Sequence, residues 1–186
     1  MKEDKIDILK SFIRTVEDYP VKGVSFKDIS PLLANVEAVK IATGLLSKEL
    51  PKETISAILA IESRGFIFGS VLSRVKNASF IMVRKAEKLV PVKSNVIFIS
   101  KSEYSTDKLG FDSSLVNKGL IVIHDDVMAT GGTSLSVVKA LVNQCRIDPS
   151  YIYLSFLVEL SFLKGRDYII RENLIPESHI RSVIVY

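Results

Sequence analysis

The chain of 186 residues alternates between two patterns of apolar positions. Predominantly apolar runs are typical of strands buried on both faces of a parallel sheet, and they occur at residues 55–61, 79–83, 121–123, 151–159 and 182–186. Apolar residues three or four positions apart predict amphipathic helices, and they occur near residues 4–18, 36–50, 65–75 and 135–142. Strands that alternate with helices predict an α/β fold with a central, mostly parallel sheet flanked by helices. A single domain over residues 1–186 is the simplest organisation.

Two segments fit neither pattern. Residues 20–31 contain Pro20, Gly23 and Pro31, which predict an irregular loop. Residues 96–109 begin with four apolar positions and continue with a long polar stretch, which predicts a hairpin with an exposed tip.

The strand at residues 121–123 leads into the most distinctive stretch of the chain. Asp125 and Asp126 follow at its carboxyl end, where open α/β sheets place ligands. A turn rich in Gly and Thr comes next, and a helix follows for which Thr133 or Ser134 is the expected N-cap. Glycines let a phosphate approach the backbone closely, and a helix N-terminus directs free N–H groups at it. The stretch therefore predicts a sugar-phosphate site in which the two carboxylates accept hydrogen bonds from sugar hydroxyls.

The strand at residues 55–61 ends in a second turn of this kind, Glu62-Ser63-Arg64-Gly65-Phe66, and a helix follows. Arg64 and the first N–H groups of that helix together predict a second anion site. Because two such turns follow two strands, we favour this interpretation over one in which Arg64 only caps a surface turn.

These residues carry a resemblance to a known family. Asp125, Asp126 and the turn after them resemble the phosphoribosyl pyrophosphate signature of the type I phosphoribosyltransferases, whereas a Walker loop and a G-x-G-x-x-G fingerprint are absent. The resemblance implies that the acidic pair faces the ribose hydroxyls and that Ser63 and Arg64 hold the pyrophosphate. It implies that the 5′-phosphate is held by the turn residues Ala129, Thr130, Gly131, Gly132 and Thr133. It also implies the family's fold, with a small hood from about residues 1–34 plus a C-terminal segment, and a flexible hairpin lid.

Residues 24–31 resemble the purine hood of the adenine-specific members of this family. The resemblance implies that Val24, Ser25, Phe26 and Lys27 surround the base, with apolar side chains on its faces and main-chain groups at its edge. The family often has Arg at the position of Lys27 and an apolar residue at that of Ser25. Reading by the main chain tolerates both changes, whereas a bidentate contact would need the guanidinium. We expect the main chain to read the base.

Two polar segments complete the resemblance. It implies that the basic loop with Arg84 and Lys88 lies near the pyrophosphate and a dimer contact, although Glu87 stands where the family has Gly, and a solvated charged turn remains the alternative. Glu103 and Tyr104 match the Glu-Tyr pair of the family's lid. Such lids exclude water from a reactive sugar cation, and Glu103 is the candidate base that takes a proton from adenine.

Composition limits the remaining possibilities. No apolar run reaches the roughly 20 residues of a membrane span, and no signal-peptide core follows the charged N-terminus, so we expect a cytoplasmic protein without a membrane partner. The net charge of +4 suits a polyanionic substrate as well as nucleic acid, but no nucleic-acid-binding motif accompanies it. The single Cys145 excludes an internal disulfide, and the two histidines do not indicate zinc. We expect His124 to be a hydrogen-bonded core residue rather than a base.

The activity that the resemblance implies is the transfer of phosphoribose from phosphoribosyl pyrophosphate to adenine, giving AMP and pyrophosphate. Arg64, Glu103, Asp125 and Asp126 are the expected catalytic residues. Mg²⁺ is the expected cofactor, held mainly through the substrate and not by a metal site of the protein, and the expected assembly is a homodimer. Two alternatives stay open: a phosphoribosyltransferase for xanthine, hypoxanthine or guanine, and a non-enzymatic sensor of phosphoribosyl pyrophosphate.

Overall fold

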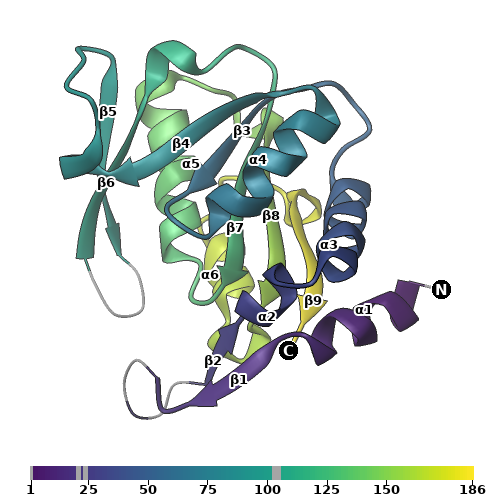
Figure 1. The fold of residues 1–186 in the computed structure, drawn as a ribbon. Helices are drawn as coiled ribbons and strands as arrows, with labels where there is room; N and C mark the ends of the chain where they lie inside the picture. Colours follow the sequence, from purple (N-terminus) through teal and green to yellow (C-terminus); the bar gives the residue numbers. More distant parts are fainter. Residues whose placement is uncertain (1, 20–21, 23–24, 102–105) are drawn as a thin grey trace. The chain divides into compact units, whose positions relative to one another are not determined.

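The computed structural model describes residues 2–19, 22, 25–101 and 106–186. The chain divides into two compact units, Met1–Leu45 and Leu46–Tyr186, both drawn in Figure 1. Three of the candidate site residues, Val24, Glu103 and Tyr104, lie outside the described residues.

The first unit is built on a short antiparallel hairpin. Its elements are α1 (Lys2–Ser11), β1 (Arg14–Glu17), β2 (Ser25–Asp28), α2 (Ser30–Leu33) and most of α3 (Val36–Glu49). Strand β1 pairs with β2 so that Val16 lies opposite Phe26 and Thr15 opposite Lys27. Across the hairpin, Lys27 Nζ donates to Thr15 Oγ1 at 2.8 Å.

Two predictions for this unit were wrong. The helix expected over residues 4–18 ends at Ser11, where Phe12 and Ile13 donate to carbonyls only three residues back and tighten the last turn. Residues 14–17 then form β1, because cross-strand pairing with β2 outweighs the helical spacing of Val16. The expected irregular loop over residues 20–31 contains β2 and the start of α2.

The second unit is a seven-stranded sheet in the order β5-β6-β4-β3-β7-β8-β9. Five adjacent strands of this sheet are parallel: β4 (Ser79–Lys85), β3 (Ile55–Ile61), β7 (Leu120–Met128), β8 (Ile152–Glu159) and β9 (Ile180–Val185). The hairpin β5 (Asn95–Lys101) and β6 (Thr106–Asp112) adds antiparallel strands beside β4. The predicted mostly parallel sheet is confirmed, as are the helices α4 (Gly65–Lys76) and α5 (Gly132–Cys145).

The remaining elements of this unit are short. Helix α6 covers Gly165–Arg171, and single turns of 3-10 helix cover Ala86–Lys88, Ser113–Leu115, Pro149–Tyr151, Ser161–Leu163 and Glu177–His179. Among the described residues, none of the helices has the length and apolar character required to cross a membrane.

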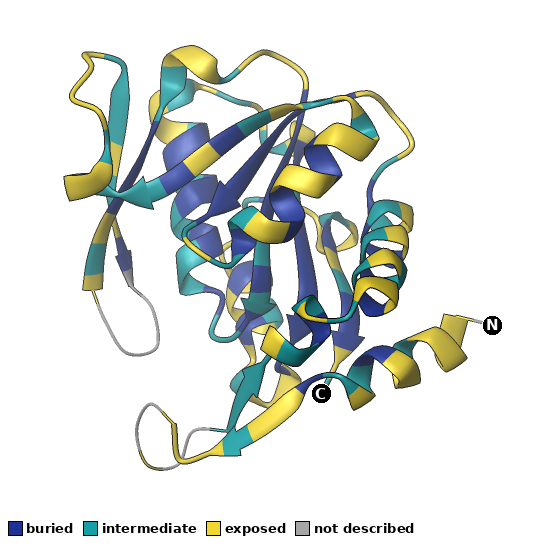
Figure 2. Ribbon diagram, in the orientation of Figure 1, coloured by how far each residue is buried: buried dark blue, intermediate teal, exposed yellow. Residues whose placement is uncertain are grey.

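The central strands of this sheet are buried on both faces, which explains their predominantly apolar sequences. Leu59 and Ile61 of β3 lie in the core cluster that includes α5 and α6 residues such as Leu135 and Ile169. The alternate position Ala60 faces α4, where Gly69 approaches it closely. Figure 2 shows the central strands buried along most of their length.

Candidate active site

Two strand–turn–helix units place the candidate residues at one edge of the sheet. Strand β7 leads through the turn 129–131 into α5, and the neighbouring strand β3 leads through residues 62–64 into α4. The two strands are parallel, so their carboxyl ends lie at the same edge. Pairing between them ends at Ala60 and His124, and β7 continues beside β8 alone. The sequence indicated that Asp125 and Asp126 follow the strand. They lie instead inside the last part of β7.

The turn before α5 encloses a small cavity of about 120 Å³. Its lining consists of Asp125, Val127, Met128, Ala129, Thr130, Gly131, Gly132, Thr133, Ser134 and Phe156. The first N–H groups of an α-helix have no partner inside the helix, and those of α5 begin at Gly132, at this cavity. The structure thus brings together the five residues predicted for the 5′-phosphate, and Phe156 also lines the cavity.

The predicted N-cap of α5 was wrong. Gly131 caps the helix with a left-handed backbone (φ 77°), and no side chain accepts a capping hydrogen bond. Ser134 is the third residue of the helix, and its Oγ donates back to the Gly131 carbonyl at 3.1 Å. A turn that needs a positive φ at its last position explains why glycine, rather than Thr133 or Ser134, ends it.

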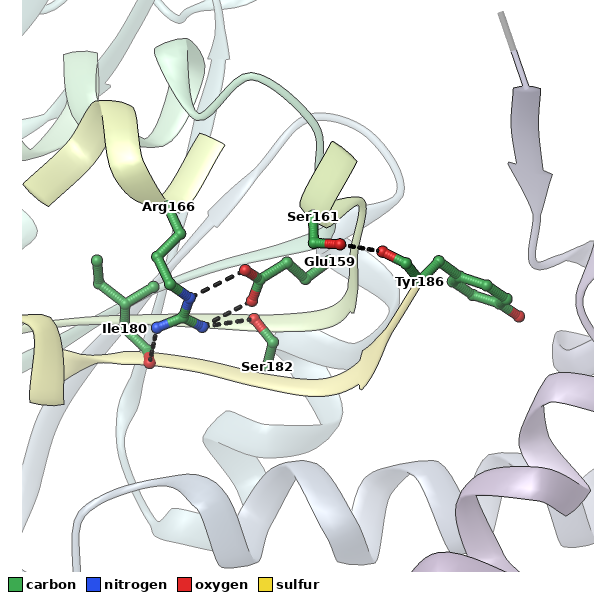
Figure 3. A network of polar contacts seen from close by, with 6 residues as sticks. All are labelled: Glu159, Ser161, Arg166, Ile180, Ser182 and Tyr186. Carbon is green, nitrogen blue, oxygen red and sulfur yellow. Dashed lines mark hydrogen bonds and ion pairs between the residues drawn. The ribbon is translucent and has the colours of Figure 1, made fainter. Parts of the chain in front are cut away.

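Helix α6 supports the same turn from outside. A Cβ on Gly165, the first residue of α6, would lie 2.2 Å from the Ala129 carbonyl oxygen and 2.9 Å from the Gly131 N. Arg166, the next residue, donates to both carboxylate oxygens of the buried Glu159, at 2.9 and 2.6 Å. Figure 3 shows this pair, with Arg166 also donating to the Ile180 carbonyl at the start of β9. The phosphate turn is therefore packed directly on a helix start that is fixed to β8 and β9.

The two carboxylates of β7 lie beside each other between the two turns. Asp125 Oδ1 accepts the Asp126 N–H at 2.9 Å and lies 3.0 Å from the position of a Cβ on Gly65, at the second turn. Asp125 lines the cavity of the phosphate turn, whereas Asp126 is buried and lies 2.9 Å from the Arg64 Nε (Asp126 Oδ2) at the second turn. Burial and the charge of the adjacent Asp126 raise the pKa of Asp125 well above its usual range. Burial also raises the pKa of Asp126, and the Arg64 guanidinium opposes that rise.

The second turn is held close to β7 by a glycine. A Cβ on Gly65 would lie 2.9 Å from the His124 carbonyl oxygen and 3.0 Å from Asp125 Oδ1. Helix α4 begins at this residue, with Arg64 as its N-cap, so Arg64 reaches Asp126 from the helix start. Ser63 is exposed in this turn, and the peptide bond that precedes it is cis.

The predicted basic residues Arg84 and Lys88 surround a carboxylate for which the sequence indicated no role. Glu62 accepts a hydrogen bond from the Lys85 N–H at 2.9 Å, and its other oxygen contacts Lys88 Nζ. Arg84 Nε lies 3.7 Å from the same carboxylate. These cations hold the pKa of Glu62 below its usual value although burial opposes them. The basic loop is therefore attached to the second turn, although Glu87 and Lys88 are both exposed, as in the alternative of a solvated charged turn.

His124 lies in the interior of β7, one residue before the acidic pair. It is completely buried, and its Nδ1 lies 3.2 Å from Ser155 Oγ on β8. Its Nε2 has no hydrogen-bond partner among the described residues. Burial lowers the pKa of His124 to about 4, so the imidazole is neutral near pH 7. This geometry supports the predicted core histidine.

The candidate base-binding residues Ser25, Phe26 and Lys27 belong to the first unit. They form β2, and the ring of Phe26 meets that of Tyr19 edge to face, with centroids 5.2 Å apart. Lys27 directs its ammonium group at Thr15, as described above, and Ser25 Oγ donates to Glu17 at 3.1 Å. Both departures from the family pattern are thus side chains that bond within the hairpin.

Metal-binding side chains are sparse in the described part of the chain. No group of three or more His, Cys, Asp or Glu side chains there has the arrangement to hold a metal ion. Asp125 and Asp126 are two adjacent carboxylates of one strand. Two carboxylates do not form a complete Mg²⁺ site by themselves. They suit this ion together with substrate phosphates and water, which is how Mg²⁺ is often bound.

Glu62 and Gly165 are the residues of this site that sequence reasoning missed, and the close contact of Gly65 with β7 was not foreseen. Glu62 and Gly65 stand inside the quoted second turn, but their contacts reach β4 and β7, which no local motif reveals. Gly165 is 34 positions beyond Gly131, and only the packing of α6 on the phosphate turn shows why it lacks a side chain.

The fold and the site define a class of protein: a mostly parallel sheet with an acidic pair and two phosphate-type turns at neighbouring strand ends is the type I phosphoribosyltransferase architecture. No family model matches the chain. The chain is 44% identical over 160 residues to the adenine phosphoribosyltransferase of Christiangramia forsetii, and the alignment covers 86% of this chain and 91% of that protein. The chain belongs to the adenine phosphoribosyltransferase family.

Solved structures agree with this assignment. The adenine phosphoribosyltransferase of Rhodothermus marinus superimposes with a TM-score of 0.83 at 33% identity, covering 99% of both chains. The Giardia lamblia enzyme, solved with 9-deazaadenine, superimposes with a TM-score of 0.85 at 27% identity, covering 97% of both chains.

Proposed function

We propose that this protein transfers the phosphoribosyl group of phosphoribosyl pyrophosphate to adenine, giving AMP and pyrophosphate. The observation that carries the proposal is the pair of turns at the ends of β3 and β7, with the Asp125–Asp126 pair between them. A substrate with a phosphate at one end and a pyrophosphate at the other matches two anion sites that flank an acidic pair. Family membership and the 9-deazaadenine bound to the Giardia relative support adenine as the base.

The 5′-phosphate occupies the cavity of the turn before α5. The free N–H groups at the start of α5 donate to it, and the hydroxyls of Thr130 and Thr133 add further donors. The helix start places its positive dipole end there. Binding energy from this remote phosphate holds the anomeric carbon in line with the incoming base.

The acidic pair acts on the ribose. Breaking the bond to pyrophosphate builds positive charge on the sugar ring, and carboxylates beside the hydroxyls stabilise that charge. Asp125 lines the phosphate cavity and also lies close to the second turn, where Asp126 pairs with Arg64, so the acidic pair lies between the two anion sites. The pyrophosphate leaves at the second turn, where Arg64 and Ser63 contact it and the basic loop with Arg84 and Lys88 lies nearby.

Mg²⁺ is the cofactor of this reaction in our proposal. When bound, it neutralises charge on the departing pyrophosphate. The ion would be held mainly through the substrate phosphates, and Asp125 and Asp126 would be the carboxylates nearest to it or to its water shell.

Adenine is bound by the hood residues and deprotonated from the lid. Val24, Ser25, Phe26 and Lys27 are proposed for the base, with Phe26 supplying an apolar face and the main chain reading the edge. Glu103 and Tyr104 are proposed for the lid, where Glu103 accepts the proton that adenine loses as its ring nitrogen attacks.

A cytoplasmic homodimer is the proposed state of the protein. Cys145 is a free thiol, which suits a reducing compartment. Helix α4 exposes Ile67, Val71 and Val75, which are four residues apart and so lie on one face of the helix. An apolar helix face of this kind suits burial against a second copy of the chain.

The test is the formation of AMP from adenine, phosphoribosyl pyrophosphate and Mg²⁺, followed by chromatography, with wild type and Asp126→Asn compared. Wild type should release one pyrophosphate per AMP, and the variant should lose about a hundredfold in kcat because charge stabilisation at the sugar is weakened. If wild type binds phosphoribosyl pyrophosphate and forms no nucleotide, the enzymatic proposal is wrong and a sensor of this ligand replaces it.

A further inference from the structure

Glu62 is an ionised carboxylate held among basic groups at the end of β3. Its side chain is only 8% exposed. One oxygen accepts the Lys85 N–H at 2.9 Å, the other contacts Lys88 Nζ, and Arg84 Nε lies 3.7 Å away. The Glu62 N–H also donates to the Val83 carbonyl, so the residue extends the pairing of β3 with β4 beyond the ladder.

The cations of the basic loop divide between two acidic partners. Lys85 turns its side chain to Asp107 on β6, with Nζ and Oδ1 3.1 Å apart. Arg84 and Lys88 are left to share Glu62. This sharing is incomplete, because Arg84 Nε is buried and makes no hydrogen bond to any residue in the described ranges. A buried donor without an acceptor is costly, and an anion that reached it would remove that cost.

We propose that Glu62 is an internal anion that occupies Lys88 and Arg84 in the free protein and competes with pyrophosphate for them. The inference rests on the proposed function, in which these two cations lie beside the bound pyrophosphate. Bound pyrophosphate must share the cations with a carboxylate of like charge, which weakens its binding. Glu62 thereby limits the retention of the product pyrophosphate. A residue that only supported the fold would act in the opposite direction, because its loss would misplace the cations and weaken the ligand.

The experiment measures the Kd of magnesium pyrophosphate by isothermal titration calorimetry for the full chain and for Glu62→Gln. The amide keeps an oxygen that can accept the Lys85 N–H but removes the charge. We expect pyrophosphate to bind about fivefold more tightly to the variant, through the loss of one like charge. The Kd of AMP, which has no pyrophosphate, should stay within about twofold on the same grounds. Glu172→Gln is the matched control, because Glu172 pairs with Lys139 at 2.6 Å on α5, and it should change neither constant.

Unchanged or weaker pyrophosphate binding in Glu62→Gln would overturn the inference. Glu62→Ala provides a second variant if the amide disturbs the turn, and it should also bind pyrophosphate more tightly than wild type. AMP synthesis by wild type separates the two proposals. An active wild type whose Glu62 variants do not gain affinity refutes the role of Glu62 alone, whereas an inactive wild type refutes the proposed function.

Discussion

At the scale of single residues, His124 shows how the site is embedded in the core. The imidazole is completely buried, with one hydrogen bond to Ser155 and a pKa lowered to about 4, so it is neutral in the folded protein near pH 7. Its neighbour Asp125 begins the polar part of β7. A buried neutral residue and the first carboxylate of the site are therefore adjacent in β7.

The lowered pKa of His124 predicts a pH-dependent stability. The unfolded chain binds the proton near the usual pKa of 6.5, whereas the folded chain resists it down to about 4. The unfolded state therefore binds more protons between these values, and stability falls as the pH is lowered through them. The loss should be about 2 kcal/mol between roughly pH 7 and pH 5.

Urea unfolding at the two pH values, with His124→Leu as the comparison, measures this effect. The variant keeps the apolar character of the strand and should lose about 2 kcal/mol less on acidification, because no group at this position titrates. The same pH dependence in both proteins would show that His124 is not the group responsible.

Lys27 supplies a prediction about the recognition of the base. Its ammonium donates to Thr15 across the hairpin, so the side chain is occupied within β1 and β2. If the main chain reads adenine, Lys27→Met should leave the KM for adenine within about threefold and the preference for adenine unchanged, at the cost of one exposed hydrogen bond. Steady-state kinetics with adenine and hypoxanthine test this. A variant that accepts hypoxanthine would assign the reading of the base to the Lys27 side chain.

At the scale of elements, the central relation is the contact between α6 and the turn that starts α5. Gly165 and Gly131 face each other there, and a Cβ on either would lie within 2.6 Å of a backbone oxygen of the other segment. Backbone atoms cannot move aside as a flexible side chain can. The phosphate turn therefore depends on a helix that supplies none of its ligands.

Gly165→Ala should displace the turn and cost about 1–3 kcal/mol of stability through overpacking. AMP and phosphoribosyl pyrophosphate should bind about tenfold more weakly, since both use the 5′-phosphate cavity, while pyrophosphate binding stays unchanged. Calorimetric Kd values for the three ligands test this. Gly44→Ala is the matched control, because nothing lies within 4 Å of that Cβ in the middle of α3. Equal losses for AMP and pyrophosphate would show general damage to the fold.

The sequence predicted the elements that are strongly apolar and local. The strand at residues 55–61 and the helices α3 and α4 lie within a few residues of their expected bounds. It did not predict β1. Over four residues, the helical spacing that includes Val16 cannot be distinguished from the alternation of a strand, and the pairing with β2 determines that these residues form a strand. It did not predict the Gly131 cap, because a positive φ depends on how the turn packs against α6. The contacts of Glu62 with the basic loop also depend on tertiary structure.

At the scale of the whole molecule, the exposed face of α4 predicts the state of assembly. Ile67, Val71 and Val75 are between 36% and 53% exposed on a helix that packs its other side on the sheet. Val71→Glu should convert a homodimer to a monomer, because a carboxylate without a partner is costly to bury. Sedimentation velocity measures the oligomeric state. Val36→Glu is the control, because Val36 is exposed and lies on another helix. A variant that sediments like wild type would exclude this face from the contact.

The central claim is that the two anion sites serve one phosphoribosyl donor and that adenine is the acceptor. The most direct measurement offers adenine, hypoxanthine, guanine and xanthine together, at equal concentration, with limiting phosphoribosyl pyrophosphate and Mg²⁺, and identifies the nucleotides by mass spectrometry. AMP should be the dominant product, accompanied by an equal amount of pyrophosphate. A 6-oxopurine nucleotide as the main product would keep the reaction and contradict adenine as the substrate.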